Sequence, residues 1–357
     1  MNEYEPRANP ASYADHVGLW AGELSAWLPE AIFDAHVHLG PPEVMGPIRP
    51  ERRCLPLATF TSLTWDELQD WYPRLFRGKR IAGLAVFPFP LHEVDVYRAN
   101  RYIIDAMKKS PAVKGFLVAH PTDAEVSRAI YAEALAEGVR FAGVKPYFDL
   151  VGKGVFECTM PEFIPEALLQ LMNDEGLVMM LHTSGRGMCD AVNQDYVRNV
   201  MERYACVRIV LAHMGRYLEV EQFHRFCDTD LLDYPALYLE MSSATLSEVY
   251  ARVLRFPQIR GRLLFGSDLP FGLITGVEAW SERAGPIFVT RDRYLWTDPH
   301  TQESSPVRPD SLSYNSYHTI KAFKDGLESL GLAAAEVEAL KQAVFCGNAA
   351  ALFASPP

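Results

Sequence analysis

Eight short apolar runs, each followed by a longer segment with helical periodicity, recur along most of this 357-residue chain. They are rich in Val, Ile, Leu and Phe, as expected for strands buried on both faces of a parallel sheet. The predicted strands are Ile32–His38, Ile81–Phe87, Val113–Ala119, Arg140–Pro146, Leu177–His182, Val207–His213, Ala236–Met241 and Arg262–Ser267. This repetition predicts an α/β fold, a (β/α)8 TIM barrel. The alternative is a doubly wound open sheet, but no G-x-G-x-x-G turn follows the first strand.

Two segments fall outside the repeat. An extra amphipathic helix is predicted at Tyr13–Leu28, within an N-terminal extension of residues 1–30. A long insertion, residues 269–317, follows the eighth strand, and within it Pro286–Thr297 predicts two short strands. No composition shift marks a linker, so residues 1–357 are expected to form a single domain.

The charge balance excludes one class of partner. The chain has 45 Asp and Glu against 34 Lys and Arg, a net charge of -11, which repels a phosphate backbone. We therefore expect no nucleic-acid partner. The apolar runs are far shorter than the roughly 20 residues that a membrane span requires. No secretory signal is visible, and the 6 cysteines form no C-x-x-C pair. These features predict a cytoplasmic protein without a membrane partner.

Polar side chains stand where the apolar runs end. The first run contains Asp34-Ala35-His36-Val37-His38, and strand alternation predicts residues 34, 36 and 38 on one face, with both imidazoles inside the barrel. A pair of structural histidines is the alternative for this motif alone. Further candidates follow four other strands: Lys145, His182, His213 and Asp268. In a barrel these positions share the C-terminal face, where active sites form.

These residues resemble the pattern of the amidohydrolase superfamily, in its amidohydrolase-related branch. That branch includes aminocarboxymuconate-semialdehyde decarboxylase-like enzymes and many metal-dependent lactonases and hydrolases. The similarity spans Ile32 to Phe353, including the F-G-S-D-L-P segment and the closing G-N-A-A-A-L-F sequence. It implies that a divalent metal, usually Zn²⁺, is held by His36, His38, His182 and Asp268. It also implies that His213 is either the ligand of a second metal or a catalytic acid/base.

Lys145 has three interpretations. In two-metal amidohydrolases a strand-four lysine is carboxylated and bridges the ions, which would make Lys145 a ligand and imply two metals. In the one-metal branch such a lysine is absent or contacts the substrate. The third interpretation is a structural ion pair. The sequence therefore leaves one or two zinc ions open.

Further residues are candidates for substrate binding. Tyr147, Arg186 and Arg216 closely follow Lys145, His182 and His213, and arginine pairs naturally with a carboxylate or phosphate. The substrate is therefore a small molecule that can be anionic, although each arginine can instead form an inter-loop ion pair. Trp296 belongs to the insertion, which leaves from the catalytic face and is expected to form a cap. Packing of its aromatic residues at a subunit interface is the alternative.

The resulting functional prediction is a metal-dependent hydrolase that cleaves a lactone, ester or amide-type carbonyl of a small molecule. Zinc lowers the pKa of bound water to about 7, Asp268 shuttles the proton, and His213 stabilises the oxyanion or binds a second ion. The alternative is a non-oxidative decarboxylase of an aromatic or muconate-like acid, and a third class is a barrel that only binds a ligand. Because barrels of this family often dimerise, we expect a homodimer.

Overall fold

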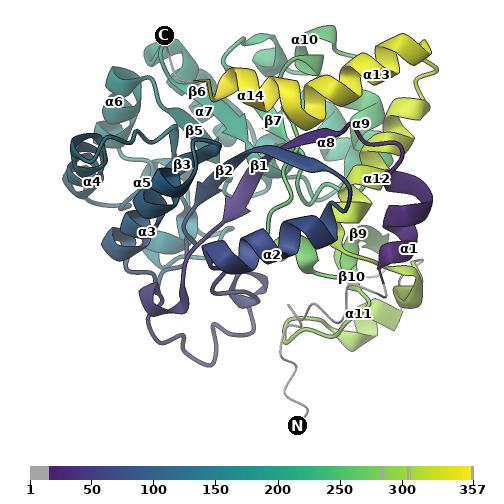
Figure 1. The fold of residues 1–357 in the computed structure, drawn as a ribbon, viewed down its shortest axis with the longest axis horizontal. Helices are drawn as coiled ribbons and strands as arrows, with labels where there is room; N and C mark the ends of the chain where they lie inside the picture. The colour runs from purple at the N-terminus through teal and green to yellow at the C-terminus, as the bar shows by residue number, and fades with distance from the viewer. Residues whose placement is uncertain (1–15, 282–284, 304, 306, 355–357) are drawn as a thin grey trace.

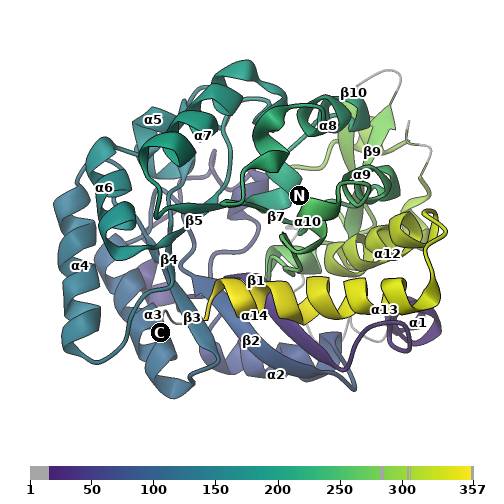
Figure 2. The ribbon, with the colours of Figure 1, turned by 90° about the horizontal axis from the view of Figure 1, so that it is seen from above.

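The protein is described by a computed structural model that covers residues 16–281, 285–303, 305 and 307–354. In this part of the chain eight parallel strands are hydrogen-bonded in sequence order, and helices surround them (Figures 1 and 2). The strands are β1 (Ala31–His38), β2 (Arg80–Phe87), β3 (Val113–Val118), β4 (Gly143–Lys145), β5 (Val178–Leu181), β6 (Arg208–Leu211), β7 (Leu237–Glu240) and β8 (Leu263–Leu264). Each lies at a predicted run, so the TIM barrel is confirmed.

Isolated backbone hydrogen bonds close the barrel between β1 and the segment that follows β8. The N–H of Asp268 donates to the carbonyl of His36 at 2.8 Å, and the N–H of His38 donates to the carbonyl of Leu269 at 2.7 Å. These two bonds bring a candidate ligand from the end of the repeat against the two histidines from its start.

The outer layer consists of helices whose apolar faces pack on the strands. They are α2 (Trp65–Leu75), α3 (Val96–Lys109), α4 (Ala124–Ala136), α5 (Met160–Phe163), α6 (Glu166–Glu175), α7 (Ala191–Arg203), α8 (Val220–Cys227), α9 (Ser247–Val253), α10 (Pro257–Arg260), α12 (Asn315–Glu328), α13 (Ala334–Gln342) and α14 (Asn348–Leu352). At the start of α2, Thr64 and Glu67 form a reciprocal capping box, which satisfies two backbone N–H groups. Among the helices described, none combines the length and apolarity needed to cross a bilayer.

The N-terminal helix is shorter than predicted. Instead of a helix over Tyr13–Leu28, the structure has one turn, α1 (Val17–Leu19), followed by a π-helical turn over Trp20–Leu24. Residues 13–15 lie outside the described residues. The indole of Trp20 is buried against the barrel, so packing holds this segment even though the helix ends early.

The insertion contains an antiparallel hairpin of β9 (Gly276–Ser281) and β10 (Gly285–Thr290), followed by α11 (Pro299–Glu303). It lies beside α12 (Figure 1). The prediction of two strands within Pro286–Thr297 is wrong, because the first strand lies upstream and the second ends at Thr290.

The hairpin register has a packing reason. Val277 and Val289 pair across the two strands and bury their side chains with Leu312 in a small separate core. A strand pair further along the chain would lose this cluster, since the register determines which side chains face the core.

Candidate active site

The strand ends deliver the candidate residues to one cavity of about 570 Å³. Six of the residues predicted as ligands line it: His36, His38, Lys145, His182, His213 and Asp268. The barrel therefore brings together groups from β1, β4, β5, β6 and the segment after β8. Residues predicted at the ends of separate strands therefore lie together in one cavity.

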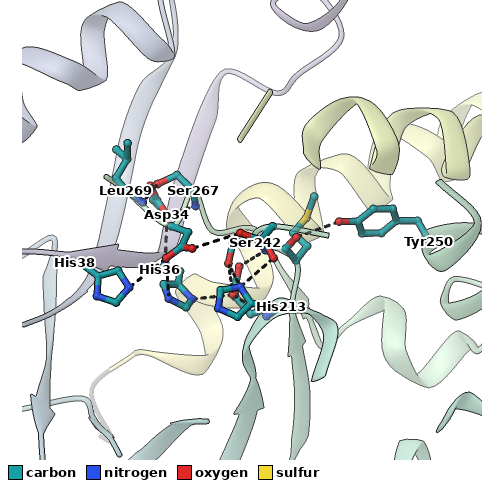
Figure 3. A network of polar contacts seen from close by, with 12 residues as sticks. Asp34, His36, His38, His213, Ser242, Tyr250, Ser267 and Leu269 are labelled. Atoms are coloured by element: carbon teal, nitrogen blue, oxygen red, sulfur yellow. Dashed lines mark hydrogen bonds and ion pairs between the residues drawn. The ribbon is translucent and has the colours of Figure 1, made fainter. Parts of the chain in front are cut away.

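Asp268 is a carboxylate partner shared by both strand-one imidazoles. Its Oδ1 lies 3.3 Å from Nε2 of His36 and 3.1 Å from Nε2 of His38. Figure 3 shows His36, His38 and His213 lying together. Asp268 and His213 have left-handed backbones, with φ of 55° and 54°. Such strain is uncommon outside glycine and concentrates at functional sites.

A glutamate at the end of β7 orients the first histidine. Oε2 of Glu240 lies 2.8 Å from Nδ1 of His36, and both residues are fully buried. Burial raises the pKa of Glu240 to about 8. A carboxylate that accepts from one ring nitrogen leaves the other free for a metal, as in many metal sites. Glu240 is not among the residues predicted from the sequence, although it ends an apolar run just as Lys145 does.

Backbone carbonyls fix two further imidazoles. Nδ1 of His182 lies 3.0 Å from the carbonyl of Thr183, and Nδ1 of His213 lies 3.1 Å from the carbonyl of Ser242. Because a carbonyl can only accept, each Nδ1 carries the hydrogen and each Nε2 keeps a lone pair. In this tautomer Nε2 is available as a metal ligand.

The electrostatics of the cavity favour neutral imidazoles beside an ionised carboxylate. Burial lowers the pKa of His36, His38 and His182, and it lowers that of His213 to about 4. Burial alone would raise the pKa of Asp268, but the hydrogen bond with His38 and nearby positive charges outweigh it, so this pKa is lowered.

This set of donors fits a divalent metal. Among the described residues, one ligand atom from each of His36, His38 and Asp268 lies within 4.8 Å of the others. A second group of the same kind consists of His36, His213 and Glu240. Neutral imidazole and carboxylate are ligands of zinc-like ions.

Lys145 is a buried amine without a hydrogen-bond partner among the described residues. Its Nζ lies 4.7 Å from the ring centre of Phe87. Burial lowers its pKa to about 8, against the opposing charges of Asp268 and Glu240. No described carboxylate lies within ion-pair distance, so the structure does not support the structural ion pair.

The candidate substrate residues separate into two groups. Tyr147, Arg216 and Trp296 line the cavity, whereas Arg186 is exposed and is not among the lining residues. A side chain at Gly187 would place a Cβ 2.1 Å from the carbonyl oxygen of Arg216. This close approach fixes the backbone of the two loops against each other while the side chain of Arg186 stays outside the cavity.

Asp34 does not share the cavity with the histidines, contrary to the alternation prediction. Its carboxylate accepts from the hydroxyl of Tyr72 on α2 at 3.1 Å and from Ser267. The pairing of β1 with β2 shifts register between Asp34 and Val37, which interrupts the regular alternation.

The cavity also contains polar residues that the sequence did not predict, namely Arg52, Asp149, Lys153, Tyr217, Ser243, Glu278 and Asn315. Tyr217 follows Arg216, and Glu278 comes from β9 of the insertion. The sequence carries no signal for Glu278, since nothing in it predicts which face of the hairpin turns toward the barrel.

A family model described as amidohydrolase matches residues 33–354. A search of curated proteins found no significant match.

Several solved structures share the fold. A 2,6-dihydroxybenzoate decarboxylase from Rhizobium has a TM-score of 0.52 at 13% identity, covering 91% of this chain and 98% of the other. A 4-oxalomesaconate hydratase from Rhodopseudomonas palustris has a TM-score of 0.52 at 15% identity, with coverages of 90% and 95%. A dihydroxybenzoic acid decarboxylase from a Polaromonas species, with bound manganese and the inhibitor 2-nitroresorcinol, has a TM-score of 0.51 at 15% identity, with coverages of 91% and 97%.

Proposed function

Since the chain belongs to the amidohydrolase family, we propose that it is a metal-dependent hydrolase that attacks a lactone, ester or amide-type carbonyl of a small molecule with water. The observation that carries this proposal is the buried, unpartnered amine of Lys145 among the candidate ligands. With it the cavity contains all six positions of a two-metal hydrolase.

We assign the metal to His36, His38, His182 and Asp268. Zinc is the proposed ion, and manganese is the alternative because the Polaromonas structure contains it. When bound, a divalent ion supplies Lewis acidity, which polarises the carbonyl and makes water more acidic.

His213 fits the role of a second ligand better than that of an oxyanion donor. Its Nδ1 hydrogen is committed to the carbonyl of Ser242, so a neutral His213 presents only a lone pair at Nε2. A group without a hydrogen at Nε2 cannot donate to an oxyanion there.

Lys145 is proposed to be carboxylated. Its neutral amine attacks CO₂, an N–C bond forms, and a proton leaves to solvent, giving a carbamate. The lowered pKa of Lys145, about 8, makes the neutral amine accessible near neutral pH. The carbamate oxygens would then serve as ligands shared by two ions.

The remaining roles belong to side chains around the substrate. Asp268 accepts the proton of the attacking water at a carboxylate oxygen and returns it to the leaving group. Arg216 binds an anionic part of the substrate, and Tyr147 lies beside it. Trp296, from the insertion, covers the cavity and limits access of bulk water.

Decarboxylation is the second candidate. It is favoured by the two decarboxylases of similar fold, one of which contains the inhibitor 2-nitroresorcinol. In that case Lys145 stays an ammonium and faces the substrate carboxylate.

Metal analysis combined with a substrate panel tests the proposal. We expect close to two metal ions in the wild type and one in Lys145→Met. Isotopically labelled bicarbonate should give a carbamate NMR signal that Lys145→Met lacks. Hydrolysis of lactones, esters or amides without CO₂ release supports the proposal. CO₂ release from aromatic or muconate-like acids favours the second candidate, and active protein without metal overturns both.

We also propose that the protein is cytoplasmic and forms a homodimer. Light scattering on the purified protein measures the oligomeric state directly.

A further inference from the structure

Three of the polar side chains that line the cavity beside the proposed metal ligands come from β9 and from the segment after β6. Arg216 and Tyr217 follow β6, and Glu278 lies on β9 of the insertion. Nη1 of Arg216 donates to the carbonyls of Thr183 and Gly185, both at 3.1 Å. These bonds fix the position of the guanidinium without neutralising its charge.

Arg216, Tyr217 and Glu278 form one wall of the cavity, and the two opposite charges on this wall, those of Arg216 and Glu278, have no ion-pair partner in the part of the chain that the structure describes. Within the described ranges, no carboxylate lies at ion-pair distance from Arg216, and Glu278 forms no ion pair either. Oε2 of Glu278 and the hydroxyl of Tyr217 are buried and interact with each other, but neither has a further hydrogen-bond partner among the described residues. Buried polar groups are nearly always hydrogen-bonded. Polar atoms at a cavity that lack a full set of hydrogen-bond partners therefore indicate where the polar atoms of a ligand bind.

Electrostatic effects agree with this geometry. Burial raises the pKa of Glu278 to about 7, although the interaction with the hydroxyl of Tyr217 and, to a smaller extent, the charge of Arg216 oppose the rise. Burial is also the main cause that lowers the pKa of Arg216. Because both groups are buried, both charged forms are costly, and a ligand that supplies the opposite charges would stabilise them.

We infer that this wall binds the zwitterionic end of an α-amino acid, with the ligand's carboxylate at Arg216 and its ammonium at Glu278. An anion would leave Glu278 without an opposite charge, and a cation would leave Arg216 without one. A neutral ligand would supply neither charge. Because the two side chains do not pair with each other, the two neighbouring charged groups of an amino acid fit between them.

The rest of the cavity indicates the side chain of this ligand. Aromatic residues contribute much of the lining: Tyr147, Phe148, Phe271, Phe288 and Trp296. Aromatic rings pack favourably on one another, and about 570 Å³ accommodates an aromatic amino acid. The inference rests on the proposed function in one respect, namely that the cavity is the substrate site. The scissile carbonyl then lies at the other end of the molecule, toward the metal ligands.

Calorimetric titration of the full-length protein with three matched probes tests the inference. L-phenylalanine carries both charges, 3-phenylpropionate lacks the ammonium, and 2-phenylethylamine lacks the carboxylate. We expect L-phenylalanine to bind at least about tenfold more tightly than either analogue, as charged hydrogen bonds require. Repeating the titration after metal removal excludes simple chelation of a metal by the amino acid.

Two variants assign the charges. Glu278→Gln should bring L-phenylalanine down to the affinity of 3-phenylpropionate, and Arg216→Gln should bring it down to that of 2-phenylethylamine. Glu221→Gln and Arg255→Gln, at exposed positions outside the cavity, are the matched controls and should leave all three affinities unchanged. If Arg216→Gln fails to fold, Glu278→Gln decides alone.

Three outcomes overturn the inference: equal affinities for the three probes, a preference that survives Glu278→Gln, or no binding of any probe. None of these readouts depends on turnover. A failure to find hydrolysis would therefore leave the affinity ratios intact, and equal affinities would overturn the zwitterion site even in an active hydrolase.

Discussion

Asp34 accepts two hydrogen bonds from Ser267, one from the backbone N–H at 2.8 Å and one from the hydroxyl at 2.5 Å. Ser267 immediately precedes Asp268, so a carboxylate on β1 sets the position of a proposed ligand at the far end of the repeat. Figure 3 shows Asp34 and Ser267 beside the cluster of histidines. The contact connects barrel closure with the geometry of the site.

Replacing Asp34 with Asn should therefore destabilise the protein and weaken metal binding together. The carboxylate accepts from backbone N–H groups at Oδ1 and from the hydroxyls of Ser267 and Tyr72 at Oδ2, and an amide with one acceptor oxygen cannot accept at both positions. We expect a loss of about 1–3 kcal/mol in the free energy of unfolding, measured by chemical denaturation. Tyr72→Phe removes a single bond and should cost less. Equal metal affinity in Asp34→Asn and wild type would contradict the positioning role.

His182→Ala should lower metal content while the barrel stays folded, because its imidazole faces the cavity rather than the packed core. Metal affinity should fall at least about tenfold, since an entire ligand is lost. Elemental analysis after dialysis measures the change. His224→Ala is the matched control. His224 lies on α8 outside the cavity, so this variant should keep its metal. Identical metal content in both variants would exclude His182 as a ligand.

Asp268→Asn tests the proposed proton transfer. The amide cannot take a proton from water, so kcat should fall by about 10²–10⁴, while part of the metal remains bound through the histidines. Steady-state kinetics at matched metal occupancy separate the two effects. A fully active Asp268→Asn would rule out the proton shuttle.

Trp296→Ala should raise KM or change selectivity without loss of metal. The indole stacks on Tyr294 at 5.4 Å and donates to the hydroxyl of Thr59 at 2.8 Å, which holds it at the cavity. Loss of this surface should cost roughly tenfold in KM. Trp280→Ala, in the same insertion but at an exposed position, is the control. A dimer that dissociates with unchanged kinetics would assign the segment to an interface.

Glu278 should make stability depend on pH in a definite direction. Its pKa rises from 4.5 to about 7 in the folded protein, so the folded state binds the proton more tightly than the unfolded chain does. Stability is therefore lost as the pH rises from 4.5 through 7, by at most about 3 kcal/mol. Glu278→Gln lacks this titration and should gain relative to wild type between pH 5 and pH 8.5. Denaturation curves at the two values check this, and a constant difference would contradict it.

The sequence predicted those parts of the site that depend on periodicity alone. Apolar runs locate strands, and the C-terminal ends of parallel strands meet on one face, which was enough to bring His36, His182 and His213 together. Glu240 follows the same rule and could have been found, since an acidic residue ending an apolar run is costly to bury without a partner.

Other features depend on contacts that no local pattern encodes. The face of Asp34 changed because β1 and β2 shift register, and this shift arises from pairing between strands distant in the sequence. The tautomers of His182 and His213 depend on the carbonyls of Thr183 and Ser242, whose directions follow from the three-dimensional turn. The hairpin register of the insertion depends on burial against Leu312.

The closure of the barrel also has a consequence for biosynthesis. His36 and His38 are translated early, but Asp268 meets them only through the backbone bonds between the segment after β8 and β1. A nascent chain that ends before residue 268 cannot contain the full set of ligands, whatever part of the barrel has already folded. The proposed ligand set is therefore completed only after synthesis of the last strand, and before that a ribosome-bound intermediate can present no more than its three histidines to an ion.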